Sequence, residues 1–347
     1  MTQLIWDSGT AYDLFISLFV LHHPADFGLR PSWTAGVRQR LSAPRRDFLE
    51  RVYTFATVPL AWLASLRGAK DADSILHQAE ALDPADCFAC LTLGPEKLEK
   101  AGSLLETVST RHRWTPEDRQ TLAEALVGEG SLTENGLEEL LSLWTQKEEA
   151  GRRYLAALSE YYRAFFCEEE ARIQPALRSG LNRGRELEAQ LPLQTLVETL
   201  SRGIRLEDLS SLQSLTLVPS FWISPLSFLS RPRQNQLLMA FSARSDLESV
   251  APGAETPDAL VGALKSLGDP TRLRILRYLA RQPMTPTELA HLLRLRPPTI
   301  VHHLHSLRLA GLVHVSVGKG AERRYDVRLE ALPAVWEALL KFLEAQR

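Results

Sequence analysis

The chain has 347 residues, of which 45% are hydrophobic and 24% are charged, a composition typical of an ordinary soluble protein. Its longest apolar run, Leu14–Leu21, is far shorter than the roughly 20 residues that a membrane-spanning helix needs, and its three cysteines do not make a disulfide framework. We therefore expect a cytoplasmic protein with no membrane segment, and the length suggests two domains.

The first 250 residues are predicted to be mostly helical. A brief strand is expected at Leu4–Trp6, and the nearly continuous apolar sequence Ala11–His22 predicts a buried helix. Apolar positions at helical spacing predict a long helical run from Gly136 to about Gln190. Pro175 and Gly180 are expected to bend or divide that run.

Four aromatic residues lie in this run at helical spacing. Such a row either lines a pocket for an effector or belongs to the core or to a dimer seam, and the second reading is the commoner one. The residues are Tyr161, Tyr162, Phe165 and Phe166.

Two strands are predicted near residues 214–241, Leu215–Ile223 and Gln236–Phe241, and we expect them to form a small antiparallel hairpin. Ser249–Glu255 has the composition of a linker and is the expected domain boundary. The predicted fold class is mainly α with small β parts (α+β). Residues 1–250 would form a mostly helical domain for dimerisation or effector binding, and residues 256–347 a second domain.

The last 90 residues have strong helix boundary signals. A first helix is expected to end at about Leu267, and Asp269 followed by Pro270 starts the next. Thr285 and Glu288 have the spacing of a capping box. The expected inward-facing residues of these two helices are Leu273, Leu276 and Leu279, then Leu289, Ala290, Leu292 and Leu293.

A further helix begins at Pro297 and ends at Gly311. At 100° per residue, Ile300, Leu304 and Leu307 share its inner face. A helix in the DNA major groove presents short polar side chains to base edges and phosphates, so the outer face is the predicted recognition surface. That face holds Pro298, Thr299, His302, His305 and Ser306.

The sequence after Gly311 predicts two strands, Leu312–Val317 and Arg323–Val327, joined by a glycine-rich turn. This pattern is typical of the wing of a winged helix-turn-helix. The residues expected to contact phosphate or the minor groove are Lys319, Arg323 and Arg324, together with Arg272. A final helix, Leu332–Phe342, has an apolar face and is a predicted dimer element.

Charge is distributed unevenly along the chain. Residues 256–347 hold 14 Lys and Arg against 8 Asp and Glu, a net charge of +6, whereas the remainder is at −8. A basic unit behind an acidic body is consistent with phosphate binding.

About the last 90 residues, a quarter of the chain, resemble the ArsR-type winged-helix repressors. The resemblance lies in the opening Gly268–Arg272, the His303–Leu304 step, and the exit formed by Leu307 and Ala310–Val313. It implies a dimeric transcriptional regulator that binds a two-fold symmetric operator and often releases it when an effector binds. The long N-terminal region is similar to the extra domain of long ArsR-type proteins.

Metal sensing and cofactors are not expected. No cysteine follows Cys167, and Glu337 and Glu344 in the last helix have no histidine partner. His302, His303 and His305 diverge around their helix, so they do not form a metal site.

The sequence therefore predicts a DNA-binding transcriptional regulator, most simply a repressor, that binds a palindromic operator as a homodimer. Its partners would be double-stranded DNA and a possible small-molecule effector in the N-terminal domain, and it would not be an enzyme. Two alternatives stay open. The winged helix would serve protein–protein contacts, or the N-terminal body would hold an enzyme, although no glycine-rich phosphate loop or nucleophile elbow is present there.

Overall fold

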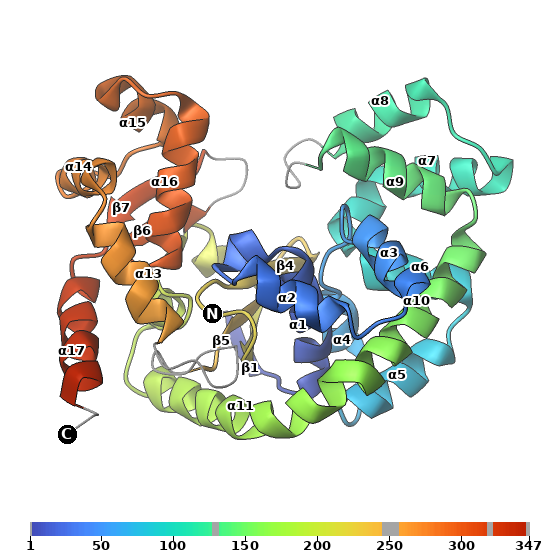
Figure 1. Cartoon of the computed structure of the whole chain (residues 1–347), viewed down its shortest axis with the longest axis horizontal. Helices are drawn as coiled ribbons and strands as arrows, with labels where there is room; N and C mark the ends of the chain where they lie inside the picture. Colours follow the sequence, from blue (N-terminus) through green and yellow to red (C-terminus); the bar gives the residue numbers. More distant parts are fainter. Residues whose placement is uncertain (1, 127–131, 245–256, 318–321, 345–347) are drawn as a thin grey trace.

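The computed structural model describes residues 2–126, 132–244, 257–317 and 322–344. Its elements form two arms above a common base (Figure 1). The long helix α11 (Cys167–Glu188) runs along the base. One arm ends in α7 (Pro95–Arg111), α8 (Pro116–Ala125) and α9 (Glu134–Trp144), and the other consists of residues 258–317 and 322–344.

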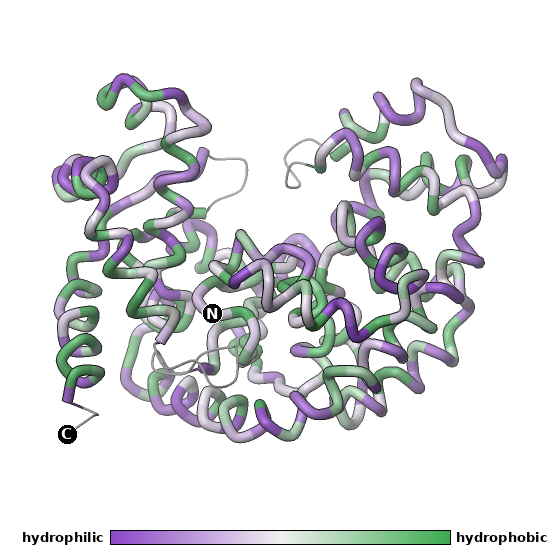
Figure 2. Tube along the Cα trace, viewed as in Figure 1, coloured by the Kyte–Doolittle hydropathy of each residue, from purple (hydrophilic) through white to green (hydrophobic). Residues whose placement is uncertain are grey.

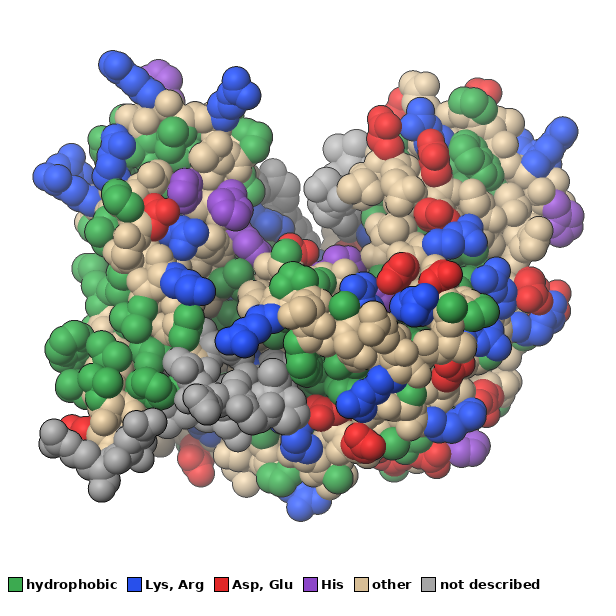
Figure 3. Space-filling view, in the orientation of Figure 1, with side chains coloured by type: hydrophobic (Ala, Val, Ile, Leu, Met, Phe, Trp, Pro, Cys, Tyr) green, Lys and Arg blue, Asp and Glu red, His purple; other side chains and the backbone are tan. Residues whose placement is uncertain are grey.

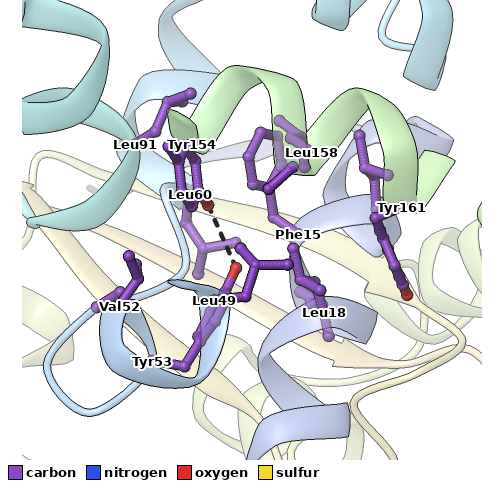
Figure 4. Packing of buried hydrophobic residues seen from close by; sticks show 14 of the residues in the cluster. Phe15, Leu18, Leu49, Val52, Tyr53, Leu60, Leu91, Tyr154, Leu158 and Tyr161 are labelled. Atoms are coloured by element: carbon purple, nitrogen blue, oxygen red, sulfur yellow. Dashed lines mark hydrogen bonds between the residues drawn. The ribbon is translucent and has the colours of Figure 1, made fainter. Parts of the chain in front are cut away.

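The N-terminal body is built around α1 (Thr10–His22), which is buried on nearly every side, as predicted. Figure 4 shows part of this core, where the Tyr53 and Tyr154 hydroxyls lie 3.2 Å apart within hydrogen-bonding distance. The other helices of the body are α2 (Pro31–Arg38), α3 (Ala43–Val52), α4 (Leu60–Ser65), α5 (Ala72–Glu80), α6 (Pro84–Thr92), α10 (Lys147–Tyr161) and α12 (Leu193–Leu200).

The long helical run divides at a different place from the one predicted. It breaks between α9 and α10, where the Thr145 hydroxyl donates to the Ser142 carbonyl and closes the end of α9. Pro175 lies inside α11 without ending it. Gly180 does not divide α11 either. Its missing side chain lets the helix approach Ala243 closely, since an added Cβ would lie 2.7 Å from the Ala243 Cβ.

The aromatic row belongs to the core. Tyr161, Phe165 and Phe166 are buried in the main hydrophobic cluster, and Tyr162 packs against it. A short π-helical turn, Tyr162–Phe166, lies between α10 and α11. The core interpretation of this row is therefore confirmed.

The predicted antiparallel hairpin is wrong. The two expected strands are β3 (Ser214–Ser220) and β5 (Gln236–Ser242), and they pair in parallel, with Ser214 opposite Gln236. The connection between them contains an unpredicted strand, β4 (Phe228–Arg233), which pairs antiparallel with β5 at the sheet edge. An edge strand tolerates Pro232, which lacks an N–H donor.

The four-stranded sheet has the order β1-β3-β5-β4, and its strand β1 (Gln3–Trp6) is the brief strand predicted at the N-terminus. Alternate residues of β5 enter different cores, since side chains alternate across a strand. Leu238 and Ala240 join the main cluster, whereas Leu237 and Met239 join a second cluster that extends to Val315.

A second sheet joins the N-terminal region to the C-terminal arm. Its order is β2-β6-β7, with β2 (Ile204–Leu206) parallel to β6 (Val313–Val317), and β6 antiparallel to β7 (Arg324–Val327). The N-terminal region thus supplies one strand to the C-terminal sheet. The predicted boundary at 249–255 lies outside the described residues, and the division into domains stays a prediction.

The buried imidazole of His22 gives a testable dependence of stability on pH. Its Nδ1 lies 2.7 Å from the Leu18 carbonyl oxygen, and its ring stacks on Tyr53 with centroids 4.6 Å apart. Burial lowers the pKa of His22 to about 3. A histidine with a lowered folded pKa stabilises the fold above its unfolded pKa and loses that stability as pH falls below it.

As the pH falls from 7.5 to 5.5, we expect the buried, neutral His22 to lower the free energy of unfolding by about 1.4 kcal/mol. Urea unfolding of the wild type and of His22→Gln at both pH values measures that cost, because other titrating groups cancel in the comparison. The same pH dependence in both proteins would contradict the expectation.

Candidate nucleic-acid interface

The C-terminal arm is a set of helices with a wing. Thr285 and Glu288 form the predicted capping box at the start of α15, and the Asp269 carboxylate accepts from the Arg272 amide at the start of α14. That amide hydrogen bond lowers the pKa of Asp269, so the cap stays ionised. The helices are α13 (Asp258–Leu267), α14 (Pro270–Leu279), α15 (Pro286–Leu293), α16 (Pro297–Leu309) and α17 (Ala331–Glu344).

The core of this arm confirms the predicted inner face of α16 and corrects two residues elsewhere. Ile300, Leu304 and Leu307 are buried. Leu273 and Leu292, which we predicted to face inward, are 48% and 43% exposed. Ile275 is buried on α14 instead. It packs with Leu279 in the same hydrophobic cluster as the inner face of α16.

The exposed surface of α16 is concentrated at its N-terminal half. Pro298, Thr299 and His302 are all exposed, and in the space-filling view histidines gather on this arm (Figure 3). No acidic residue lies in the first turn of α16. The positive end of the helix dipole there attracts a phosphate group. This surface therefore has the polarity that a DNA backbone requires.

Other predicted site residues lie apart from this surface. Ser306 is half-buried, and its hydroxyl donates to the His302 carbonyl at 3.1 Å. Arg272 donates to the Ser266 hydroxyl at 3.2 Å, and Arg272 and Ser306 line one cavity of about 330 Å³ against α13. His305 is also half-buried. The structure thus brings Pro298, Thr299 and His302 together on one surface. Arg272, His305 and Ser306 are not part of that exposed surface.

The wing holds its two arginines differently. Arg324 donates to the Pro283 carbonyl at 3.1 Å and pairs with the capping-box carboxylate of Glu288 at 3.4 Å. Arg323 is exposed and has no ion pair within the described residues. It is therefore the wing arginine better placed to bind a phosphate. Lys319 lies outside the described residues.

Sequence reasoning missed three exposed residues beside this surface. Arg294 and Arg296 flank the turn between α15 and α16, and Arg294 has a left-handed backbone with φ of 55°. Val301 is 51% exposed on α16, and an exposed apolar side chain there suits a thymine methyl group. The position of the two arginines immediately before the recognition helix could have indicated that they lie beside this surface.

Several contacts fix this arm to the N-terminal region. The buried guanidinium of Arg308, at the end of α16, donates to the carbonyl oxygens of Ser201, at 2.9 Å, and Arg202. Arg205 of β2 pairs with Asp326 of β7 at 2.8 Å. The N-terminal region therefore contacts both α16 and the wing directly.

This arrangement of three helices and a two-stranded wing defines a winged helix-turn-helix. Residues 269–315 match the family described as bacterial regulatory protein, arsR family, so the chain contains an ArsR-family helix-turn-helix domain behind a long N-terminal region. This family indicates DNA-binding transcriptional regulation. The comparison with curated proteins found no match, and neither did the comparison with solved structures.

Among the described residues, no three His, Cys, Asp or Glu side chains are grouped so as to hold a metal ion. Within the same part of the chain, no helix has the length and apolar character needed to cross a bilayer.

Proposed function

We propose that this protein is a transcriptional repressor that binds a palindromic operator as a homodimer. The observation that supports this most is the exposed N-terminal half of α16, free of acidic side chains in its first turn and flanked by Arg294 and Arg296. In this proposal Thr299 and His302 read base edges, Val301 contacts a thymine methyl, and Arg323 anchors a phosphate.

The proposed dimer rests on the last helix. Helix α17 is rich in hydrophobic residues along its length (Figure 2), and the surface of the arm around it is mostly hydrophobic (Figure 3). Trp336 and Leu343 are 63% and 61% exposed, and such a contiguous apolar surface marks a protein–protein contact. We propose that a second copy of the chain covers it. Leu329, Leu332 and Leu340 extend the same surface.

Replacing Trp336 with glutamate tests this dimer. Because Trp336 is exposed in the single chain, Trp336→Glu should leave the fold intact and shift the protein to a monomer in sedimentation. Loss of the second half-site contact should weaken palindrome binding by about 100-fold or more. Glu337→Gln, on the same helix, is the control. A variant that stays dimeric would place the interface elsewhere.

Salt titration tests the DNA contact itself. A protein that displaces counterions from DNA loses affinity linearly in log salt, with a slope of about −0.9 for each phosphate contacted. Arg323→Ala should reduce the magnitude of that slope by about 0.9 per subunit bound and weaken all sequences alike. Arg113→Ala, which removes an exposed arginine from the opposite arm, should not. An unchanged slope for Arg323→Ala would remove the wing from the interface.

A role for the N-terminal body in sensing belongs to the same proposal. β2 from this body pairs with β6, and Arg308 fastens the end of α16 to it. An effector bound in or beside the body would therefore act on the DNA-binding elements through direct contacts. The protein would be a regulator without catalytic activity, located in the cytoplasm with its DNA.

A further inference from the structure

A cavity of about 580 Å³ lies within the N-terminal region, between the four-stranded sheet and the helices beside it. Strands β1, β3 and β5 line one wall, and helix α4 with the start of α7 lines the other. The described lining residues all lie between Ile5 and Leu238, so the C-terminal arm is not among the elements that form this cavity.

The strand wall carries polar groups that are available to a ligand. Ile5, Thr216 and Leu238 lie opposite one another across β1, β3 and β5, so they share one face of the sheet. Ser214 and Gln236 form the neighbouring row of the same face. The side chains of Ser214, Thr216 and Gln236 make no hydrogen bond to any residue that the structure describes. A ligand in the cavity can therefore bind to them.

The helix wall is apolar. Trp62 of α4 is half-buried, and its ring packs edge-on against Phe15 with centroids 6.3 Å apart, which fixes the indole ring. Leu93 and Leu98 extend this wall toward α7. Ligand pockets combine apolar walls with a few placed polar groups, and this cavity has that character. A flat, mainly apolar molecule fits between the sheet and the helices.

The charge of the cavity favours an acid. Arg233 is the sole charged residue among the described lining residues. It is exposed at the end of β4, opposite Gln236 of β5, and it forms no ion pair in the part of the chain that the structure describes. A guanidinium group binds a carboxylate with two parallel hydrogen bonds, whereas a cationic ligand would meet no carboxylate on these walls.

We propose that this cavity binds a small aromatic carboxylic acid. Its ring system packs between Leu238 on the sheet and Trp62 on α4. Its carboxylate pairs with Arg233 at the mouth, beside the free amide of Gln236.

The sheet that lines this cavity also packs toward the wing. Side chains alternate between the two faces of a strand, so Thr216 faces the cavity while Leu215 faces away from it. Leu215 and Met239 belong to the hydrophobic cluster that contains Val315 of β6. In this proposal a ligand that shifts β3 and β5 alters the position of the wing. The regulatory part rests on the proposed function, whereas the binding part does not.

Calorimetry on the full chain tests the binding part. The probe is 2-naphthoate, with 2-naphthylmethylammonium as its cationic counterpart and acetate as the carboxylate alone. We expect saturable binding of 2-naphthoate, about tenfold tighter than the ammonium compound, since an exposed charge changes affinity by about threefold in each direction. Acetate should show no saturable binding, because burial of the rings supplies most of the affinity.

Variants of the lining residues locate the bound probe. Ala61 of α4 is half-buried and lines the cavity, so Ala61→Phe should fill the space and abolish 2-naphthoate binding. Arg233→Gln should weaken binding by about threefold. Because Arg233 is exposed, this variant keeps the test decisive if Ala61→Phe does not fold, which thermal unfolding checks. Arg178→Gln, an exposed arginine of α11 that is absent from the described lining, is the matched control.

Three results would overturn the site. They are the absence of saturable binding, equal affinity for 2-naphthoate and the ammonium compound, and 2-naphthoate binding that Ala61→Phe and Arg233→Gln both leave unchanged.

The regulatory part has a separate measurement, the affinity for an operator duplex with and without saturating 2-naphthoate. A change in affinity that Ala61→Phe removes supports coupling. Binding of 2-naphthoate without any effect on DNA affinity would confirm the site and overturn the coupling. Binding of 2-naphthoate by a protein that binds no DNA at any salt concentration would overturn the proposed function and leave the site standing.

Discussion

Thr299→Glu should abolish specific DNA binding while leaving the fold at least as stable as the wild type. Thr299 is the third residue of α16 and is exposed. A carboxylate at this position suits the positive end of a helix, so the substitution favours the helix itself. The same carboxylate would face DNA phosphates and remove a polar contact to a base edge.

We expect a cost of about 2 kcal/mol for each half-site, which in a dimer amounts to about a 1,000-fold loss of affinity. Fluorescence anisotropy with a labelled operator duplex measures this loss, and thermal unfolding checks the fold. Thr121→Glu, an exposed threonine on α8 in the opposite arm, is the matched control. Wild-type affinity in Thr299→Glu would show that α16 does not enter the groove.

Gly203→Ala should destabilise the protein by about 3 kcal/mol, because the strain of a left-handed backbone adds to a steric contact. Gly203 has a φ of 108°, a conformation that side chains disfavour. A Cβ there would lie 3.1 Å from both the His314 ring and the Val313 carbonyl oxygen. The Gly203 carbonyl also accepts from the Val315 amide at 2.8 Å, so the strain falls on the β2–β6 junction.

Urea unfolding measures this effect, and Gly102→Ala is the control. A Cβ at Gly102, inside α7, would meet no atom within 4 Å, so alanine should stabilise that helix by roughly 0.5–1 kcal/mol. The Gly203 variant should also bind DNA more weakly, since the wing rests on β2. Equal stability of the two variants would show that the β2–β6 junction accommodates the added methyl group without strain.

The sequence predicted the recognition helix closely because its boundaries are local. Pro297 fits the first turn of a helix, and Gly311 has the positive φ, 67°, that glycine adopts readily. The capping box of α15 was predictable for the same reason. The prediction that Leu273 faces inward was wrong. In a short helix with several apolar residues, the sequence alone does not fix which side is buried, and in α14 the buried side contains Ile275.

Features that depend on distant pairing were not predictable. β2 has only three residues, and its partner β6 begins more than one hundred residues later, so no local pattern indicates the pair. The parallel register of β3 and β5 likewise depends on where β4 returns to the sheet. The ion pair of Arg324 with Glu288 depends on tertiary contact as well, and it separates two wing arginines that look alike in sequence.

The most direct test of the central claim is a binding selection from genomic DNA fragments with the purified full-length protein at two salt concentrations. We predict recovery of a palindromic site whose affinity falls steeply between the two concentrations, as expected for several phosphate contacts. Retention of fragments without sequence preference would contradict a specific operator. No retention at either salt concentration would contradict DNA binding and favour a winged helix that contacts protein.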